Sequence, residues 1–333
     1  MNQLHGILFA DRTEPDMRVL TGSGYTASLP YGGNFRIIDF MLSNFVNAGI
    51  CDVGMIVQGG CQELLNHVGS GKAWNLSRKN GGLEILPPIS CRPYLGWMDA
   101  LWDFLPYLRH IRQEYVLLAT GDYVTNFPID DMLVSHKAAG ADITVAYRAA
   151  DDGTEKFLEI CLLSTDLLIR LTERCAERRQ PSFHQGILVE EADRLKIHSY
   201  FFTGFAGIVR NVQAYYDQNM ALLASEVREE LFHPNRPIQT VDSFMPGAYY
   251  GPEASVERSL VSDHCQIEGA VSDSVLLPGV IVEPGAFVSY CVLTKGSVVR
   301  RNAYLDHIIM TGNTVLRRTQ ESSRPNLKVP VNF

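Results

Sequence analysis

The sequence lacks several features that define whole classes of protein. It has no apolar run near about 18 residues and no signal-peptide pattern, so it predicts neither a membrane span nor export. Its 29 Lys and Arg are outnumbered by 37 Asp and Glu, and the net charge of −8 argues against nucleic-acid or anionic-membrane partners. The nine His and seven Cys show no clustered spacing and no C-x-x-C pair, which argues against zinc. We therefore expect a cytoplasmic protein whose cysteines are free thiols.

The first 232 residues alternate strand-like and helix-like patterns, which favours an α/β domain with a mostly parallel sheet covered on both faces. The expected strands cover residues 4–10, 52–58, 115–120 and 141–148. One helix is expected over 99–113, kinked at Pro106, and a second begins near Asp166 behind a Ser164 cap. A third expected helix is long and amphipathic and covers 211–232.

The pattern changes after residue 232. Residues 233–252 are rich in proline and glycine and read as a linker to a second domain at 253–333. In that domain apolar residues recur every six positions, at Val275, Ile281, Phe287, Leu293, Val299 and Leu305. Such a period predicts a parallel β-helix in which every sixth side chain takes the same inner position.

Several motifs carry a specific resemblance. They are SLPYGGNFRIIDFMLSNFVNAGI at 28–50, HVGSGKAWNLSRKNGGLEILPP at 67–88, TGDYV at 120–124 and AYYDQNMALL at 214–223. With these motifs the chain resembles the ADP-glucose pyrophosphorylase (glucose-1-phosphate adenylyltransferase) family, and within it the GlgD-type regulatory subunit. The resemblance implies a glucosyltransferase-A-like, Rossmann-like α/β domain followed by a left-handed parallel β-helix.

The phosphate-binding loop of that family is replaced in this sequence. When the family pattern AGGxGxRLxxLT is laid on residues 10–21, its glycines fall on Asp11, Arg12 and Glu14, and its arginine falls on Asp16. The following family lysine falls on Thr26. Glycines let backbone N–H groups approach a phosphate, and cations stabilise the charge that develops there. A carboxylate at about 4 Å from a phosphate oxygen instead costs on the order of kilocalories.

The metal and sugar-phosphate positions are also depleted. Asp122 matches the family's first magnesium carboxylate, although a turn-capping role is the competing interpretation. The second carboxylate falls near Ile208, which offers no metal ligand. The resemblance implies a long sugar-phosphate segment, and here only residues 149–156 occupy its place. We expect no catalytic residue and no metal or cofactor, unless Asp122 still binds magnesium.

Four further positions match the family and also have structural interpretations. Gln58 matches a glutamine near the nucleotide base. Gly96 and Asp99 match a helix start at the nucleotide, or serve as a turn and an N-cap. Arg36 matches an arginine near a regulatory anion site, or forms a salt bridge.

The resemblance implies a non-catalytic regulatory subunit in bacterial glycogen biosynthesis. Its expected partner is a catalytic paralogue that makes ADP-glucose from ATP and glucose 1-phosphate, in a heterotetramer, with a homo-oligomer also possible. The segments 28–50 and 67–88, helped by the β-helix, are expected to form the contact. Two alternatives remain open: a weakly active nucleotidyltransferase using Asp122, and a β-helix acyltransferase using His264 or His307.

Overall fold

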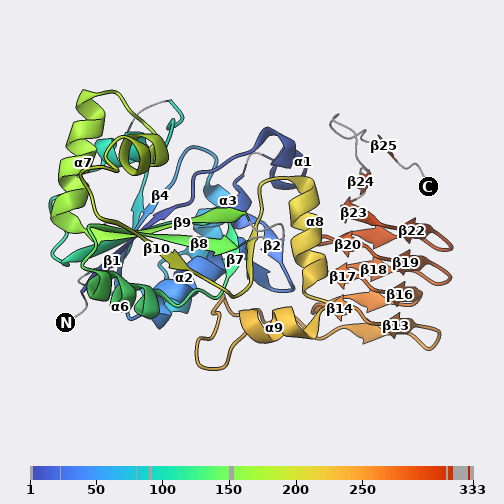
Figure 1. The fold of residues 1–333 in the computed structure, drawn as a ribbon. Helices are drawn as coiled ribbons and strands as arrows, with labels where there is room; N and C mark the ends of the chain where they lie inside the picture. The colour runs from blue at the N-terminus through green and yellow to red at the C-terminus, as the bar shows by residue number, and fades with distance from the viewer. Residues whose placement is uncertain are drawn as a thin grey trace.

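The computed structural model describes residues 3–22, 24–79, 81–89, 92–149, 154–312, 314–317 and 329–330. An α/β part built on a seven-stranded sheet is followed by a solenoid of short strands (Figure 1). Cys91, residues 150–153 and most of the chain after 317 lie outside the described residues. The described cysteines are all free, as expected.

The large sheet is mostly parallel, as the sequence predicts. Its strand order is β10-β8-β9-β6-β1-β4-β5. β9 runs antiparallel to both neighbours, and the other pairs are parallel. The strands are β1 Leu4–Phe9, β4 Asp52–Ile56, β5 Gly82–Leu86, β6 Tyr115–Thr120, β8 Ile143–Ala149, β9 Glu155–Ser164 and β10 Ile197–Phe201.

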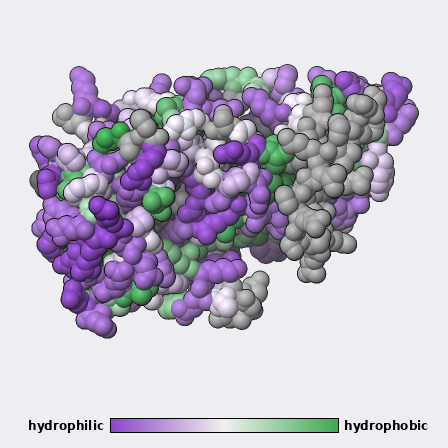
Figure 2. Space-filling model, turned by 90° about the horizontal axis from the view of Figure 1, so that it is seen from above, coloured by the Kyte–Doolittle hydropathy of each residue, from purple (hydrophilic) through white to green (hydrophobic). Residues whose placement is uncertain are grey.

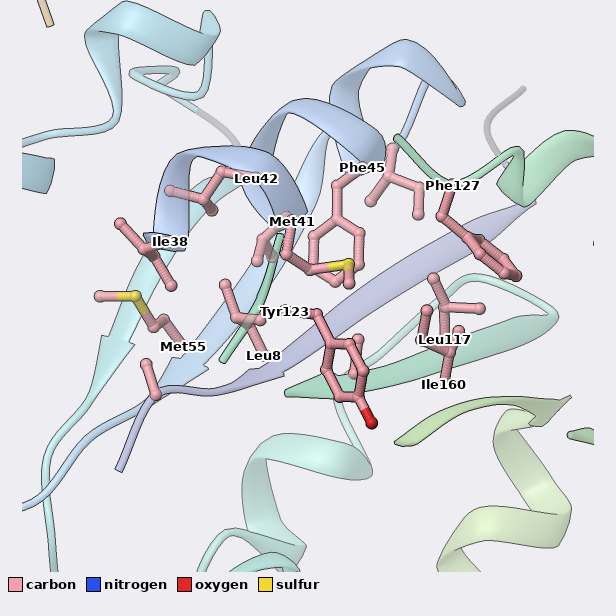
Figure 3. Packing of buried hydrophobic residues seen from close by; sticks show 14 of the residues in the cluster. Leu8, Ile38, Met41, Leu42, Phe45, Met55, Leu117, Tyr123, Phe127 and Ile160 are labelled. Atoms are coloured by element: carbon pink, nitrogen blue, oxygen red, sulfur yellow. The ribbon is translucent and has the colours of Figure 1, made fainter. Parts of the chain in front are cut away.

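Alternate side chains of the central strands enter two different cores, because successive strand residues point to opposite faces. Leu8 and Leu117 pack under helix α2, Ile37–Asn47, which points Ile38 and Met41 at the sheet (Figure 3). The other face, with Phe9 of β1, is covered by α4 Trp97–Asp103, α5 Leu105–Leu108 and α7 Thr165–Glu177. The sheet is thus buried on both sides, which is why its strands read as continuous apolar runs.

Two of the three expected helices are divided. The single kinked helix over 99–113 is wrong, because α4 ends at Asp103 and Pro106 lies in the first turn of the separate helix α5. The single helix over 211–232 is also wrong. There α8, Val212–Ala221, and α9, Ser225–Leu231, are separated at Ala224, whose backbone is extended. Arg228 stabilises the break by donating to the carbonyls of residues 222 and 223 at 2.6 and 2.9 Å.

The helix expected behind Ser164 is confirmed as α7. Its N-cap hydroxyl accepts a hydrogen bond from the Leu167 N–H at 3.3 Å. The remaining elements of this part are α1 Arg18–Thr21, α3 Gln62–Val68, α6 Ile129–Ala139, β2 Pro30–Tyr31, β3 Phe35–Arg36, β7 Tyr123–Thr125 and β11 Ala206–Ile208, with short 3₁₀ turns at Pro15–Met17, Thr26–Ser28 and Lys72–Trp74 and a π-helical turn at His184–Val189.

The solenoid consists of three sheets, ordered β12-β15-β18-β21, β13-β16-β19-β22 and β14-β17-β20-β23-β24-β25. Its strands are β12 Tyr249–Tyr250, β13 Ser255–Glu257, β14 Leu260–Val261, β15 Gln266–Ile267, β16 Ala270–Ser272, β17 Val275–Leu276, β18 Ile281–Val282, β19 Phe287–Ser289, β20 Val292–Leu293, β21 Val298–Val299, β22 Tyr304–Asp306, β23 Ile308–Thr311, β24 Thr314–Arg317 and β25 Val329–Pro330. Pairing between coils is parallel up to β23. β12 already pairs with β15, so the solenoid begins inside the expected linker.

The hexad pattern has the correct period but the wrong phase in its first half. The inward residues are Leu276, Val282, Val288, Leu293, Val299 and Leu305. The register pairs Val275 with Val292, so this coil is one residue shorter than three hexads. Because of that shortening, Ile281 and Phe287 face outward, whereas the expected positions from Leu293 onward are inward as predicted.

The two parts of the chain pack directly against each other. α8 lies beside β20 of the solenoid (Figure 1). Val275 and Val292 are buried in one cluster with Tyr215 and Tyr216 of α8. The Tyr216 hydroxyl donates to the Tyr290 carbonyl at 2.7 Å. Val275 is therefore buried by the neighbouring domain rather than by its own coil.

The expected subunit contact through 28–50 is wrong for most of that segment. Ile37 through Phe45 of α2 are buried in the core of the chain itself, and Tyr31 is fully buried. The 67–88 segment does expose side chains, including Lys72 and Arg78. Hydrophilic residues cover most of the face in Figure 2, with hydrophobic residues in small separate groups. Among the described residues, the structure contains no helix with enough apolar length to cross a bilayer.

Candidate functional site

A cleft of about 730 Å³ opens beside the carboxyl end of the large sheet, where folds of this type place ligands. It lies between the chain at 13–25 and the chain at 88–93. Its lining residues include Arg18, Tyr25, Gln58 and Arg92. Gln58 is thus the one expected nucleotide-site residue that lines this cleft directly.

The loop after β1 does not point all its acidic groups at the cleft. Asp11 accepts a hydrogen bond from the Gln58 amide at 3.1 Å, and burial raises the pKa of its carboxyl. Asp16 is exposed, and Glu14 is half-buried at the start of the 3₁₀ turn. The acidic residues of this loop therefore do not form one row of carboxylates that faces a phosphate in the cleft.

Arg12 of the same loop turns inward and forms the centre of an ion cluster next to the cleft. Its Nε lies 3.3 Å from Oδ2 of Asp122, and its Nη2 lies 3.1 Å from Oε2 of Glu159. Asp122 is fully buried and follows β6, which lies between β1 and β9 in the sheet. The three side chains thus come from β9 and from the loops that follow β1 and β6, which are adjacent strands of the sheet. Arg210, just after β11, contacts Glu159 from the other side.

This ion cluster governs the protonation of Asp122. Burial raises the pKa of Asp122 to about 7, while the Arg12 charge opposes the rise. The Asp122 carboxylate also accepts from the Thr120 hydroxyl at 3.3 Å. Its described partners are thus side chains rather than the N–H groups of its own turn, which does not support the turn-capping interpretation.

With Arg12 in place, the residues around Asp122 do not fit a magnesium ion. Ile208 pairs with Tyr123 in the β11–β7 ladder, so the position opposite Asp122 carries no ligand oxygen. A guanidinium lies against the carboxylate where a cation would bind. Within the described ranges, no group of three or more His, Cys, Asp and Glu is arranged to hold a metal.

The strands on either side of the implied sugar-phosphate segment follow each other closely in the sequence. β8 and β9 are antiparallel neighbours, and Arg148 pairs with Lys156 while Ala149 pairs with Glu155. Regular pairing therefore continues almost to the connection between the strands. The described chain supplies no additional strand or helix at this edge of the site.

Asp99 has a different role from the expected N-cap. It lies in the first turn of α4, and Gly96 occupies the N-cap position. The Asp99 carboxylate accepts two hydrogen bonds from Arg92, at 2.6 and 2.7 Å, which hold the pKa of that carboxyl below its usual range. Asp99 thereby positions an arginine at the edge of the cleft.

Gly96 is required by a close backbone approach and not by a turn. Its φ of 169° is extended, but a Cβ there would lie 2.4 Å from the Pro181 carbonyl oxygen. That oxygen also accepts the Met98 N–H at 3.0 Å. The glycine therefore holds the start of α4 against the chain near 181.

Arg36 lies apart from the ion cluster, and its backbone N–H donates to Oδ2 of Asp39 at 2.8 Å, whereas its guanidinium has no carboxylate partner among the described residues. Its Nη1 donates to the Ser28 carbonyl at 2.6 Å, so the expected salt bridge is not found there. His264 and His307 both occupy coil corners with positive φ. His307 stacks on Tyr290 at 4.6 Å and lies 2.9 Å from Asp306.

Glu159 and Arg210 were not identified from the sequence. Glu159 interrupts the apolar run of β9, and a charged residue within such a run is a usable signal. The irregular register between β8 and β9 surrounds it, and its φ is 51°. Bulges of this kind re-aim side chains toward sites, and their position could not be deduced from spacing.

Comparison with known proteins gives the family. A nucleotidyl transferase profile matches residues 17–158, and a GlmU-like C-terminal hexapeptide profile matches residues 247–321. The second match agrees with a left-handed β-helix.

Three relatives match most of the chain. The chain is 31% identical to the glycogen biosynthesis protein GlgD of Bacillus subtilis (strain 168), over 85% of its own length and 82% of the relative. It is 32% identical to a glucose-1-phosphate adenylyltransferase of Bacillus mycoides (strain KBAB4), over 82% of each. It is 30% identical to that of Geobacillus stearothermophilus, over 82% of this chain and 79% of the relative.

Proposed function

Because this chain belongs to the glucose-1-phosphate adenylyltransferase family, we propose that it is a non-catalytic, GlgD-type regulatory subunit of glycogen biosynthesis. It binds a catalytic paralogue and changes the rate at which that partner makes ADP-glucose from ATP and glucose 1-phosphate. The effect passes through the contact, because a bound subunit shifts its partner's conformational equilibrium only by differential affinity for the two states.

One observation carries this proposal. The direct pairing of β8 with β9, up to Ala149 and Glu155, takes the place of the segment that binds sugar phosphate in catalytic members. The Arg12 contact with Asp122 supports the same conclusion for the metal position. An enzyme needs its reactants held in line, and this chain keeps the sheet but not the groups that hold them.

The solenoid offers a surface for the partner. Phe287 and Tyr304 stack in parallel at 5.3 Å on the β13-β16-β19-β22 sheet and are 40% and 68% exposed. In Figure 1 this sheet lies on the side away from α8. Exposed aromatic side chains are typical anchors of protein interfaces.

The test is reconstitution with a catalytic glucose-1-phosphate adenylyltransferase subunit from the same cell. We expect co-elution, a changed kcat or KM for ADP-glucose synthesis, and no synthesis by this chain alone. Tyr304→Ser combined with Phe287→Ser should weaken the complex, whereas Tyr249→Ser on another sheet should not. Turnover by the pure chain, or normal kinetics with no complex, would refute the proposal.

A further inference from the structure

The Arg12 guanidinium lies between the carboxylates of Asp122 and Glu159, at the position where the family resemblance implies a metal ligand. We propose that Arg12 is a built-in replacement for the divalent cation. Arg12 supplies permanently the positive charge that an exchangeable ion would otherwise supply. Asp122 and Glu159 form a cation site, and the Arg12 side chain occupies it.

The geometry supports replacement rather than a chance surface ion pair. Asp122 is fully buried, and the Arg12 side chain is only 25% exposed. Arg12 uses different nitrogens for the two acids, Nε for Asp122 and Nη2 for Glu159. A planar guanidinium can bridge two carboxylates in this way, as a compact divalent ion would by direct coordination.

The charges around the cluster show why a cation is needed there. Asp122 and Glu159 bring two carboxylates against one guanidinium, and Asp11 directly precedes Arg12 in the loop. Burying a carboxylate costs a large desolvation free energy unless an opposite charge is paired with it. Arg12 provides that charge for Asp122, and Arg210 contributes at Glu159.

Buried polar atoms of the cluster are left without a hydrogen-bond partner in the described part of the chain, among them Oε2 of Glu159, which contacts Arg12 only as an ion pair. Oδ1 of Asp122 is buried and has no hydrogen-bond partner among the described residues, and neither has Nη1 of Arg12. An unpartnered, fully buried carboxylate oxygen is a group that a metal ion could use. Removing the guanidinium should therefore leave Asp122 and Glu159 facing a space that favours a divalent cation.

This inference does not depend on the proposed regulatory role, because its readout is metal binding by the isolated chain. Mn²⁺ is the probe, and free Mn²⁺ is measured by electron paramagnetic resonance. We expect no saturable binding to the unmodified chain that depends on Asp122. Arg12→Ala and the more conservative Arg12→Gln should bind one Mn²⁺ at least about tenfold more tightly than the unmodified chain.

Controls separate the cluster from general charge effects. Arg18→Ala removes an exposed arginine that lines the cleft beside the cluster and should not create a site. Arg12→Lys keeps the positive charge and should also show no new Mn²⁺ binding. Adding Asp122→Asn to Arg12→Gln should abolish the Mn²⁺ binding that Arg12→Gln creates. Mn²⁺ should raise the Tm of Arg12→Gln and leave that of the unmodified chain unchanged.

Two outcomes would overturn the proposal. The first is Mn²⁺ binding by the unmodified chain that Asp122→Asn removes, which would show an open site and needs no Arg12 variant. The second is a folded Arg12 variant, verified by circular dichroism, that binds Mn²⁺ no better than the unmodified chain. Neither result would bear on whether the chain regulates a partner.

Discussion

Val292→Ala should weaken the packing at the interface between the α/β part and the solenoid. Val292 is fully buried in the cluster that joins α8 to β20. The change removes two methyl groups, at about 0.8 kcal/mol per buried carbon, and adds a cavity cost, for about 2–3 kcal/mol in total. Regulation of a partner requires this interface, because a solenoid that moves freely relative to the α/β part cannot transmit a conformational preference.

Calorimetry and limited proteolysis measure the effect. We expect a Tm lower by several degrees and faster cleavage between residues 233 and 248, where the described chain has no helix or strand. Val298→Ala is the matched control, since it removes the same two methyls from a half-buried outward position of another sheet. If Val298→Ala lowers the Tm as much as Val292→Ala does, the interface between the two parts contributes nothing specific to stability and the reasoning is wrong.

Three further changes test other parts of the structure. Glu191→Gln should cost about 1 kcal/mol at neutral pH in a urea titration. Burial opposes ionisation of Glu191, but Arg174 and two further exposed arginines still lower its pKa, so its contribution is present above about pH 4.5 and lost as pH falls. An equal cost at pH 3 would contradict this. Burial lowers the pKa of His5 to about 4, so its contribution is present above about pH 6.5 and lost as pH falls toward 4, by roughly 3 kcal/mol. His5→Gln should flatten the dependence of unfolding free energy on pH in that window, and an unchanged slope would count against it. Gly96→Ala should lower the Tm by forcing Pro181 away from the new Cβ, at about 1–3 kcal/mol, and an unchanged Tm would show that the backbone yields freely.

The sequence predicts best where one local rule decides the structure. Apolar runs marked β1, β4 and β6 to within two residues, because strands buried on both faces allow few polar side chains. Ser164 marked the start of α7, because a cap satisfies its backbone locally.

Prediction failed where particular side-chain contacts and the lengths of individual coils decide the structure. The break between α8 and α9 depends on Arg228, which donates back to the carbonyls of residues 222 and 223, and the hexad phase depends on coils that are each one residue shorter than three hexads. The loop after β1 gave the largest difference at the site. Alignment placed Arg12 on a glycine of a phosphate loop, but its partners come from strands that only the folded sheet brings together.

The junction of β8 and β9 has a consequence for how activity is gained or lost in such a scaffold. Both strands keep their ladder to within a residue or two of the connection, so the sheet needs nothing from whatever joins them. Doubling the length of a flexible connection costs only about 0.6 kcal/mol of closure entropy. A substrate-binding segment could therefore be inserted or deleted at this point with little cost in folding free energy. A catalytic protein and a non-catalytic relative could then share the same stable fold.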